Sequence, residues 1–269
     1  MGTDMFKLVA MDLDETLLNA DKKVSSRTSE ILRRLWEKGI HIAIASGRIL
    51  CTEQIHASSF CDRASYVAYN GSLVVFEDGT RWEATLSPDV TREIAKYCVE
   101  HRHHMQTYYD EKIYCAKSSP ELMSDMDTRN TSVVEVGDMS KADLPPTPKA
   151  VIVDRPEVVP DIVDDLRKAF PSLKITRSSA WVIEVNPPDV DKAKGLEMVC
   201  KNLGITKDDV IVFGDNNNDL TMIQWAGCGV AVANALPEIK EIADRVSPKE
   251  MSEGVAAVLE EVFADILRA

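Results

Sequence analysis

The sequence lacks long apolar runs and paired cysteines. No apolar stretch approaches the roughly 18 residues that a membrane-spanning helix needs. The opening residues, MGTDMFKLVA, show neither the basic nor the apolar region of a signal peptide, so we expect a cytoplasmic protein. The six cysteines are scattered without a C-x-x-C pair, which favours reduced thiols packed as small apolar groups.

Positive charge is also scarce. Lysine and arginine number 31 against 44 aspartates and glutamates, which gives a formal charge of −13. This charge disfavours nucleic acid and anionic membrane surfaces as partners, so we expect neither. The 269 residues, of which 45% are apolar, suit one large domain or two smaller ones. Nothing in the sequence predicts the oligomeric state.

Short apolar runs alternate with helical patterns in the first and last parts of the chain. The runs FKLVAMD, IHIAIAS, SYVAYNG, DVIVFGD and CGVAVAN are typical of buried parallel strands. Helical spacing is found in residues 25–38, 219–225, 238–243 and 252–267. The alternation predicts an α/β fold with a Rossmann-like, doubly wound parallel sheet.

Residues 84–187 follow a different pattern. Two strand pairs, in HMQTYYDEKIYCAK and LKITRSSAWVIEVN, are typical of hairpins, and DLPPTP is a turn-rich connector. We therefore predict an α+β domain inserted into the α/β core. The core would comprise residues 1–83 and 188–269.

Aspartates follow two of the predicted strands. Asp12 and Asp14 come at the end of one, and Asp215 and Asp219 follow another. Ligands of an open parallel sheet bind at the carboxyl ends of its strands, so these side chains are expected to converge. Two like charges about 4 Å apart repel by roughly 4 kcal/mol at an effective dielectric of 20, so a cation is needed. Oxygen ligands without histidine or thiolate indicate Mg²⁺.

A third strand end, IAIASGR, offers groups that bind anions. Ser46 supplies a hydroxyl, and Gly47 and its neighbours supply backbone amides that can hold phosphate oxygens. A cation can come from Lys192 or Lys194 at a predicted helix start. Carboxylates, Mg²⁺, a hydroxyl and a lysine together describe a site for phosphoryl transfer.

The order of these motifs resembles the haloacid dehalogenase (HAD) superfamily, in particular its Cof-like phosphatase branch with a large α/β cap. The resemblance covers nearly the whole chain. It rests on DLDETLL, ASGR, DKAKG and GDNNNDLTMI in order, together with YNG at residues 69–71 and VAVANALPEIKEIADRV near the end.

The resemblance implies a role for each matching position. Asp12 would be the nucleophile that forms an aspartyl-phosphate, and Asp14 would be the acid and base. Magnesium would bind Asp12, Asp215 and the backbone carbonyl of Asp14, while Asp219 would position metal-bound water. The resemblance also implies phosphate-binding residues, namely Ser46, Gly47, Lys192 and Asn218, and candidates for the substrate pocket, namely Arg48 and Asn70. Lys194 is expected to face solvent.

Four positions depart from the family pattern, in which glycine is usual. They are Glu15, Asp189, Ala193 and Ala233. None of them removes a catalytic functional group. We expect them to affect local backbone geometry and not the chemistry.

The sequence therefore predicts an Mg²⁺-dependent phosphatase acting on small phosphorylated metabolites, with sugar phosphates as the leading class. A phosphomutase of the same superfamily remains an alternative, because it would use the same aspartyl-phosphate. Two non-enzymatic alternatives are a phospho-accepting signalling module and a catalytically silent binding protein. The substrate itself and the cap residues that select it are not predicted.

Overall fold

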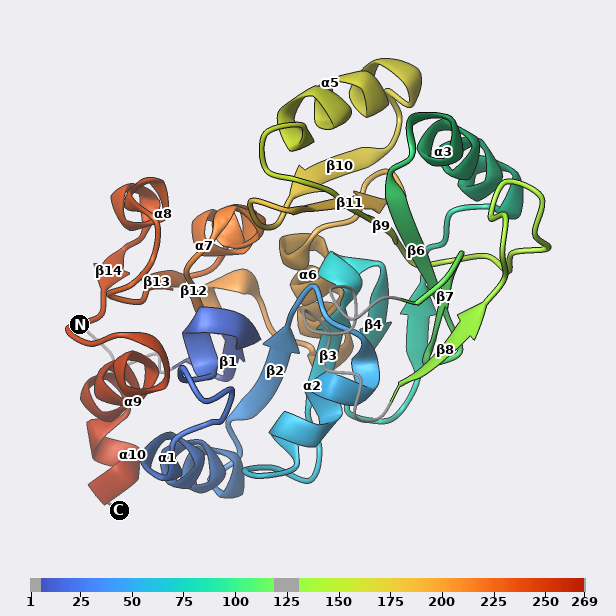
Figure 1. The fold of residues 1–269 in the computed structure, drawn as a ribbon. Helices are drawn as coiled ribbons and strands as arrows, with labels where there is room; N and C mark the ends of the chain where they lie inside the picture. Colours follow the sequence, from blue (N-terminus) through green and yellow to red (C-terminus); the bar gives the residue numbers. More distant parts are fainter. Residues whose placement is uncertain (1–5, 119–130, 269) are drawn as a thin grey trace. The chain divides into compact units, whose positions relative to one another are not determined.

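The computed structural model describes residues 6–118 and 131–268 and divides the chain into two compact units. One unit joins Met1–Trp82 with Asp191–Ala269, and the other is Glu83–Val190. Each unit has its own sheet (Figure 1) and its own cluster of buried apolar side chains. The assignment of one unit as catalytic core and the other as cap stays a prediction.

The first unit contains an eight-stranded sheet in the order β14-β13-β12-β1-β2-β3-β4-β5. Strand β1 (Leu8–Met11) lies between β12 (Val210–Gly214) and β2 (His41–Ala45) and is parallel to both. From β1 the chain adds β2 and β3 on one side and, much later, β12, β13 and β14 on the other. This reversal makes the carboxyl ends of β1 and β12 a topological switch point, where ligands of such sheets bind.

The remaining strands of this sheet are mostly parallel, as predicted. They are β3 (Ser65–Ala68), β4 (Leu73–Val75), β5 (Arg81–Glu83), β13 (Cys228–Ala231) and β14 (Arg245–Val246). The exception is β4, which is antiparallel to β3. The short turn Tyr69–Gly71, with three positive φ angles, reverses the chain between them. The α/β prediction is confirmed, with the correction that the sheet is mixed at this end.

Two groups of helices pack with this sheet. In one group, α1 (Ser26–Glu37), α9 (Met251–Val262) and α10 (Ala264–Arg268) contact one another. In the other, α7 contacts both α6 and α8. The bounds of the other helices are α2 (Leu50–Ala57), α6 (Lys192–Leu203), α7 (Leu220–Trp225) and α8 (Pro237–Ile242).

The prediction of one helix over residues 252–267 is wrong. The chain breaks at Phe263 between α9 and α10, and the Phe263 side chain is fully buried. The apolar spacing continues through the break, so the pattern alone did not reveal it.

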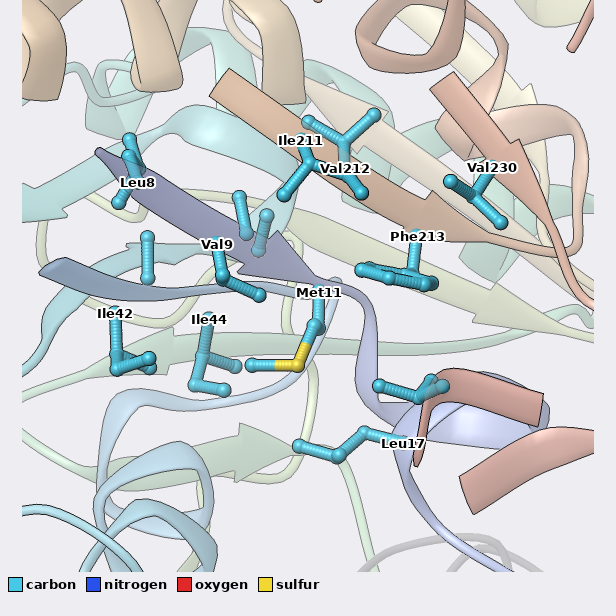
Figure 2. Close-up of a cluster of buried hydrophobic side chains, with 14 of the residues drawn as sticks. Leu8, Val9, Met11, Leu17, Ile42, Ile44, Ile211, Val212, Phe213 and Val230 are labelled. Carbon is cyan, nitrogen blue, oxygen red and sulfur yellow. The ribbon is translucent and has the colours of Figure 1, made fainter. Parts of the chain in front are cut away.

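The core of the first unit is formed by the predicted apolar strands. Figure 2 shows Val9 and Met11 of β1 beside Ile42 and Ile44 of β2 and Phe213 of β12. Removing such side chains from water stabilises the fold by about 1.5–3 kcal/mol each. Because all four residues of β1 are buried, the strand gives Asp12, the residue that follows it, a fixed place.

The second unit has a six-stranded sheet in the order β10-β11-β9-β6-β7-β8. Both predicted hairpins are present, as β6 with β7 and as β10 with β11. Residues Asp110 and Glu111 have positive φ and form the first turn. The elements are α3 (Pro88–His101), β6 (His104–Tyr109), β7 (Lys112–Cys115), β8 (Ser132–Glu135), β9 (Ala150–Val153), α5 (Val159–Ala169), β10 (Lys174–Arg177) and β11 (Val182–Asn186). Strand β8 was not predicted.

Among residues 6–118 and 131–268, no helix has both the length and the apolar character to cross a membrane.

Candidate active site

Three buried aspartates meet at the carboxyl ends of β1 and β12. Asp12 follows β1, Asp215 follows β12, and Asp219 ends the helical turn Asn217–Asp219. One carboxylate oxygen from each lies within 4.8 Å of the other two. The strand ends thus bring together three of the four carboxylates that the sequence predicted to converge.

Lys192 supplies the positive charge of this cluster. It is the first residue of α6, and the side chain of Asp191 caps that helix by accepting from the Lys194 amide. The Lys192 ammonium donates to Asp12 Oδ1 and to Asp219 Oδ1, each at 2.6 Å, and its side chain is 0% exposed. Burial disfavours the charged form, but the two carboxylates hold the pKa of Lys192 above its ordinary value. Lys194 is exposed.

One lysine does not balance three carboxylates. Burial raises the pKa of Asp12 well above its ordinary value, and Asp219 and Asp215 add to the rise although Lys192 opposes it. Burial and the charge of Asp219 also raise the pKa of Asp215, to about 7. The cluster would therefore gain from a further cation.

Asp219 is fixed by the backbone around it. Its Oδ2 accepts from the amides of Asp215 at 2.8 Å and Asn216 at 3.1 Å. A Cβ at Gly214 would lie 2.6 Å from the Asp219 Cβ, so the close approach requires glycine at position 214. Asp219 is thereby held by two amides and one lysine.

Thr16 is a further residue of the site. Its hydroxyl donates to Asp215 Oδ1 at 2.7 Å, and the residue is fully buried. This hydrogen bond lowers the pKa of Asp215, against the larger effect of burial. A hydroxyl two residues after Asp14 in DLDET was the available signal, but such residues are common in turns.

The side chain of Asp14 is not part of the cluster of three carboxylates and pairs with Arg48. The guanidinium donates from Nε to Oδ2 at 2.6 Å and from Nη2 to Oδ1 at 2.7 Å, and Lys22 approaches Oδ1 at 3.0 Å. Burial opposes ionisation, but these partners lower the pKa of Asp14 to about 2. The next residue, Glu15, has a left-handed backbone with a φ of 57°.

The third strand end contributes Ser46 and its neighbours. Ser46 is buried, and its hydroxyl accepts from the Arg48 amide at 3.2 Å, across the intervening Gly47. The Ser46 carbonyl accepts from the Asn70 amide at 2.9 Å. The side chain of Asn218 donates to Asn70 Oδ1 at 3.2 Å. The structure thus links Ser46, Asn70 and Asn218, which the sequence could not place together.

The sequence matches the family described as haloacid dehalogenase-like hydrolase over residues 9–259, so the chain belongs to this family. It is 29% identical over 264 residues to the 5-amino-6-(5-phospho-D-ribitylamino)uracil phosphatase YitU of Bacillus subtilis, covering 96% of this chain and 97% of that protein. It is 30% identical over 263 residues to the phosphoglycolate phosphatase of Methanopyrus kandleri, covering 97% of this chain and 99% of that protein.

A solved structure has the same fold. The crystal structure of a haloacid dehalogenase-like hydrolase from Bacteroides thetaiotaomicron superposes with a TM-score of 0.86 at 29% identity, covering 96% of this chain and all of that one. The predicted membership of the Cof-like branch is confirmed, and the protein is a HAD-type phosphatase that hydrolyses phosphoric monoesters.

Proposed function

We propose that the protein is an Mg²⁺-dependent phosphatase that hydrolyses small sugar phosphates through an aspartyl-phosphate at Asp12. The observation that carries this proposal is the convergence of Asp12, Asp215 and Asp219 on one buried lysine at a topological switch point. Lys192 holds the Asp12 carboxylate in one position and supplies positive charge beside it, which supports Asp12 as the nucleophile.

The donor set supports Mg²⁺ as the cation. Asp12 and Asp215 would supply carboxylate oxygens, and the backbone carbonyl of Asp14 would supply a third, which are the hard ligands that Mg²⁺ prefers. When bound, the cation would offset the negative charge of the transferring phosphoryl group. The oxygens of Asp219 already accept from Lys192 and two amides, which supports an orienting role for this residue.

The reaction would proceed in two transfers. Asp12 Oδ attacks the phosphorus, the bond from phosphorus to the leaving oxygen breaks, and Asp14 gives that oxygen a proton. Asp14 then takes a proton from a water molecule whose oxygen attacks the aspartyl-phosphate, and phosphate leaves as Asp12 is regenerated. Lys192, Ser46 and the amides beginning at Gly47 would hold the phosphoryl oxygens, with Asn218 at the same site.

In this scheme the pairing of Asp14 with Arg48 must change when the substrate binds. Arg48 favours the ionised form of Asp14, whereas the first transfer needs the protonated form. A doubly charged phosphoryl group is a competing partner for the guanidinium. A phosphoryl group bound to Arg48 would weaken the ion pair between Arg48 and Asp14, so that the Asp14 carboxylate could bind a proton. This supports Arg48 as a substrate-pocket residue.

We also propose that the unit Glu83–Val190 is the cap that selects the substrate. Support comes from its separate sheet and apolar core, which allow it to vary independently of the site. The names of the two relatives describe a phosphorylated ribityl compound and phosphoglycolate. Both are small phosphate monoesters, which supports the same class for this chain.

A substrate screen tests the proposal. Purified wild type is incubated with a panel of sugar phosphates and other phosphorylated metabolites, with MgCl₂ or with EDTA, and released phosphate is measured. We expect Mg²⁺-dependent phosphate release, its loss in Asp12→Asn, and its retention in Lys194→Ala, the matched surface control. Release that is equal in EDTA, or an isomeric sugar phosphate in place of free phosphate, would contradict the proposal.

A further inference from the structure

Three consecutive residues after β3 have a left-handed backbone. Tyr69, Asn70 and Gly71 have φ angles of 51°, 58° and 96°. Only glycine adopts this region freely, although asparagine tolerates it better than most residues. Two of the three positions therefore carry side chains in an unfavourable conformation, and such strain is kept where the surroundings impose it.

The surroundings hold the turn from two sides. The Tyr69 amide donates to the Arg48 carbonyl at 3.1 Å, and the Asn70 amide donates to the Ser46 carbonyl at 2.9 Å. On the other side, a Cβ at Gly71 would lie 2.3 Å from the carbonyl oxygen of Asp191, so only glycine fits there. The turn is thus fixed between the loop after β2 and the start of α6.

This arrangement places the Asn70 amide group against Asn218. Asn70 is buried, with 5% exposure, and its Oδ1 accepts from Asn218 Nδ2 at 3.2 Å. The two residues are 148 positions apart in the chain. Because the Asn218 amide group is planar, the hydrogen bond that its nitrogen donates restricts the direction in which its oxygen and second amide hydrogen point.

We propose that Asn70 is a positioning residue that fixes the orientation of the Asn218 amide toward the substrate. The inference rests on the proposed function of Asn218 at the phosphoryl group. Glycine at position 70 would suit the backbone better than asparagine, so the left-handed turn alone does not account for this side chain. The purpose that the geometry supports is acceptance of the hydrogen bond from Asn218.

The substitution Asn70→Gly separates the role of Asn70 in the turn from its role as a partner of Asn218. It relieves the backbone strain at position 70 and removes the side-chain amide. We expect Asn70→Gly to fold normally with an unchanged or higher melting temperature, while kcat falls by about tenfold and KM changes little. The matched control is Arg102→Gly, at another left-handed position, where α3 ends. It should keep the wild-type kcat.

A double-mutant cycle then shows whether Asn70 acts through Asn218. Four proteins are compared, namely wild type, Asn70→Gly, Asn218→Ala and the double variant, with both steady-state kinetics and urea unfolding. We expect the double variant to be as active as Asn218→Ala to within about twofold, because removing Asn70 cannot matter once its partner is gone. Wild-type kcat in Asn70→Gly, or losses that multiply in the double variant, would overturn the inference.

The same four proteins separate this inference from the proposed function. If the wild type released no phosphate from any substrate, the proposed function would have failed, and the contact would be judged from the unfolding data. Free energies of unfolding that are non-additive for Asn70 and Asn218 would support the fixed amide pair. Additive values would overturn it.

Discussion

The ammonium of Lys192 lies 2.6 Å from Asp12 Oδ1 and 2.6 Å from Asp219 Oδ1, and it is fully buried. One lysine at the start of α6 therefore bridges Asp12, which follows β1, and Asp219, which ends the helical turn after β12. Asp12 and Asp219 would otherwise repel each other at short range. The bridge holds Asp12 in one position and presents a positive charge beside it.

The two lysines of VDKAKG should consequently differ in their effect on catalysis. Lys192→Ala removes the buried positive charge that Asp12 and Asp219 share, whereas Lys194 is exposed. Loss of a buried charged partner commonly costs about 2–5 kcal/mol, so Lys192→Ala should lower kcat/KM at least tenfold. Loss of an exposed charge commonly costs less than about 0.5 kcal/mol, so Lys194→Ala should lower kcat/KM less than threefold. Steady-state kinetics on both variants check this, and an equal loss in the two would contradict it.

Relief of the strained backbone at Glu15 should stabilise the protein. Glu15 has a φ of 57°, and its carbonyl accepts from the Asn234 side chain at 2.7 Å, a contact that glycine retains. A left-handed residue costs about 1–2 kcal/mol, and glycine loses about 0.5–1 kcal/mol in entropy, so Glu15→Gly should gain about 0.5–1 kcal/mol.

Urea unfolding in EDTA measures this gain. The control is Glu15→Gln, which removes the charge and keeps the strain, and it should gain less than Glu15→Gly. Equal gains in the two variants would assign the effect to charge and not to the backbone.

The raised pKa of Asp215 predicts how stability depends on pH without metal. Asp215 keeps its proton up to about pH 7 in the folded protein, against an ordinary value of 3.8. The folded state then binds more protons than the unfolded state between these values, so the free energy of unfolding should fall as pH rises from about 4 to about 7. Mg²⁺ favours the ionised form and should flatten the slope. A flat profile in EDTA would contradict the raised pKa of Asp215.

Thr16 should tune this titration. Its hydroxyl stabilises ionised Asp215, so Thr16→Val should raise the pKa of Asp215 further and weaken Mg²⁺ binding at pH 7. Thr16→Ser keeps the hydroxyl and serves as the control. Calorimetric titration with MgCl₂ compares the two, and equal affinities in Thr16→Val and wild type would show that the hydrogen bond has no such effect.

Arg48 should control the titration of Asp14. With the guanidinium in place, the pKa of Asp14 is about 2, although burial alone would raise it. Arg48→Ala removes the partner that lowers this pKa most, so the pKa of Asp14 should rise from about 2, while Arg48→Lys should give an intermediate value. Carbon-13 NMR titration of the aspartate carboxyls measures both. A value still near 2 in Arg48→Ala would show that Arg48 does not govern Asp14.

The sequence predicted the parts of the site that follow directly from strand ends. An apolar run that ends in aspartate places the carboxylate at the carboxyl end of a strand, so Asp12 and Asp215 could be located without a structure. The helical period also predicted that Lys192 and Lys194 point in different directions, since side chains two residues apart on a helix lie about 200° apart around its axis. The resemblance to a family supplied the roles of these residues.

Contacts between remote loops could not be predicted. Two examples are the hydrogen bond from Asn218 to Asn70 and the one from Thr16 to Asp215. Both depend on how loops pack together, which the periodic pattern of apolar residues does not predict. The sharp reversal before β4 depends on left-handed residues, of which only Gly71 is obvious in sequence. Glu15 and Asp189 stand where glycine is usual in the family, and both have a positive φ. Glycine adopts a positive φ without steric cost, which explains why it is usual at these two positions.

Capture of the phosphorylated enzyme tests the central claim most directly. Wild type is mixed with Mg²⁺ and an aryl phosphate, quenched during turnover and reduced with borohydride, which converts an aspartyl-phosphate to homoserine. We predict homoserine at position 12, found by mass spectrometry of the peptide containing VAMDLDETLL, and its absence when substrate is omitted. Phosphate release during turnover with no modification at Asp12, or with modification at another aspartate instead, would contradict the assignment of Asp12 as the nucleophile.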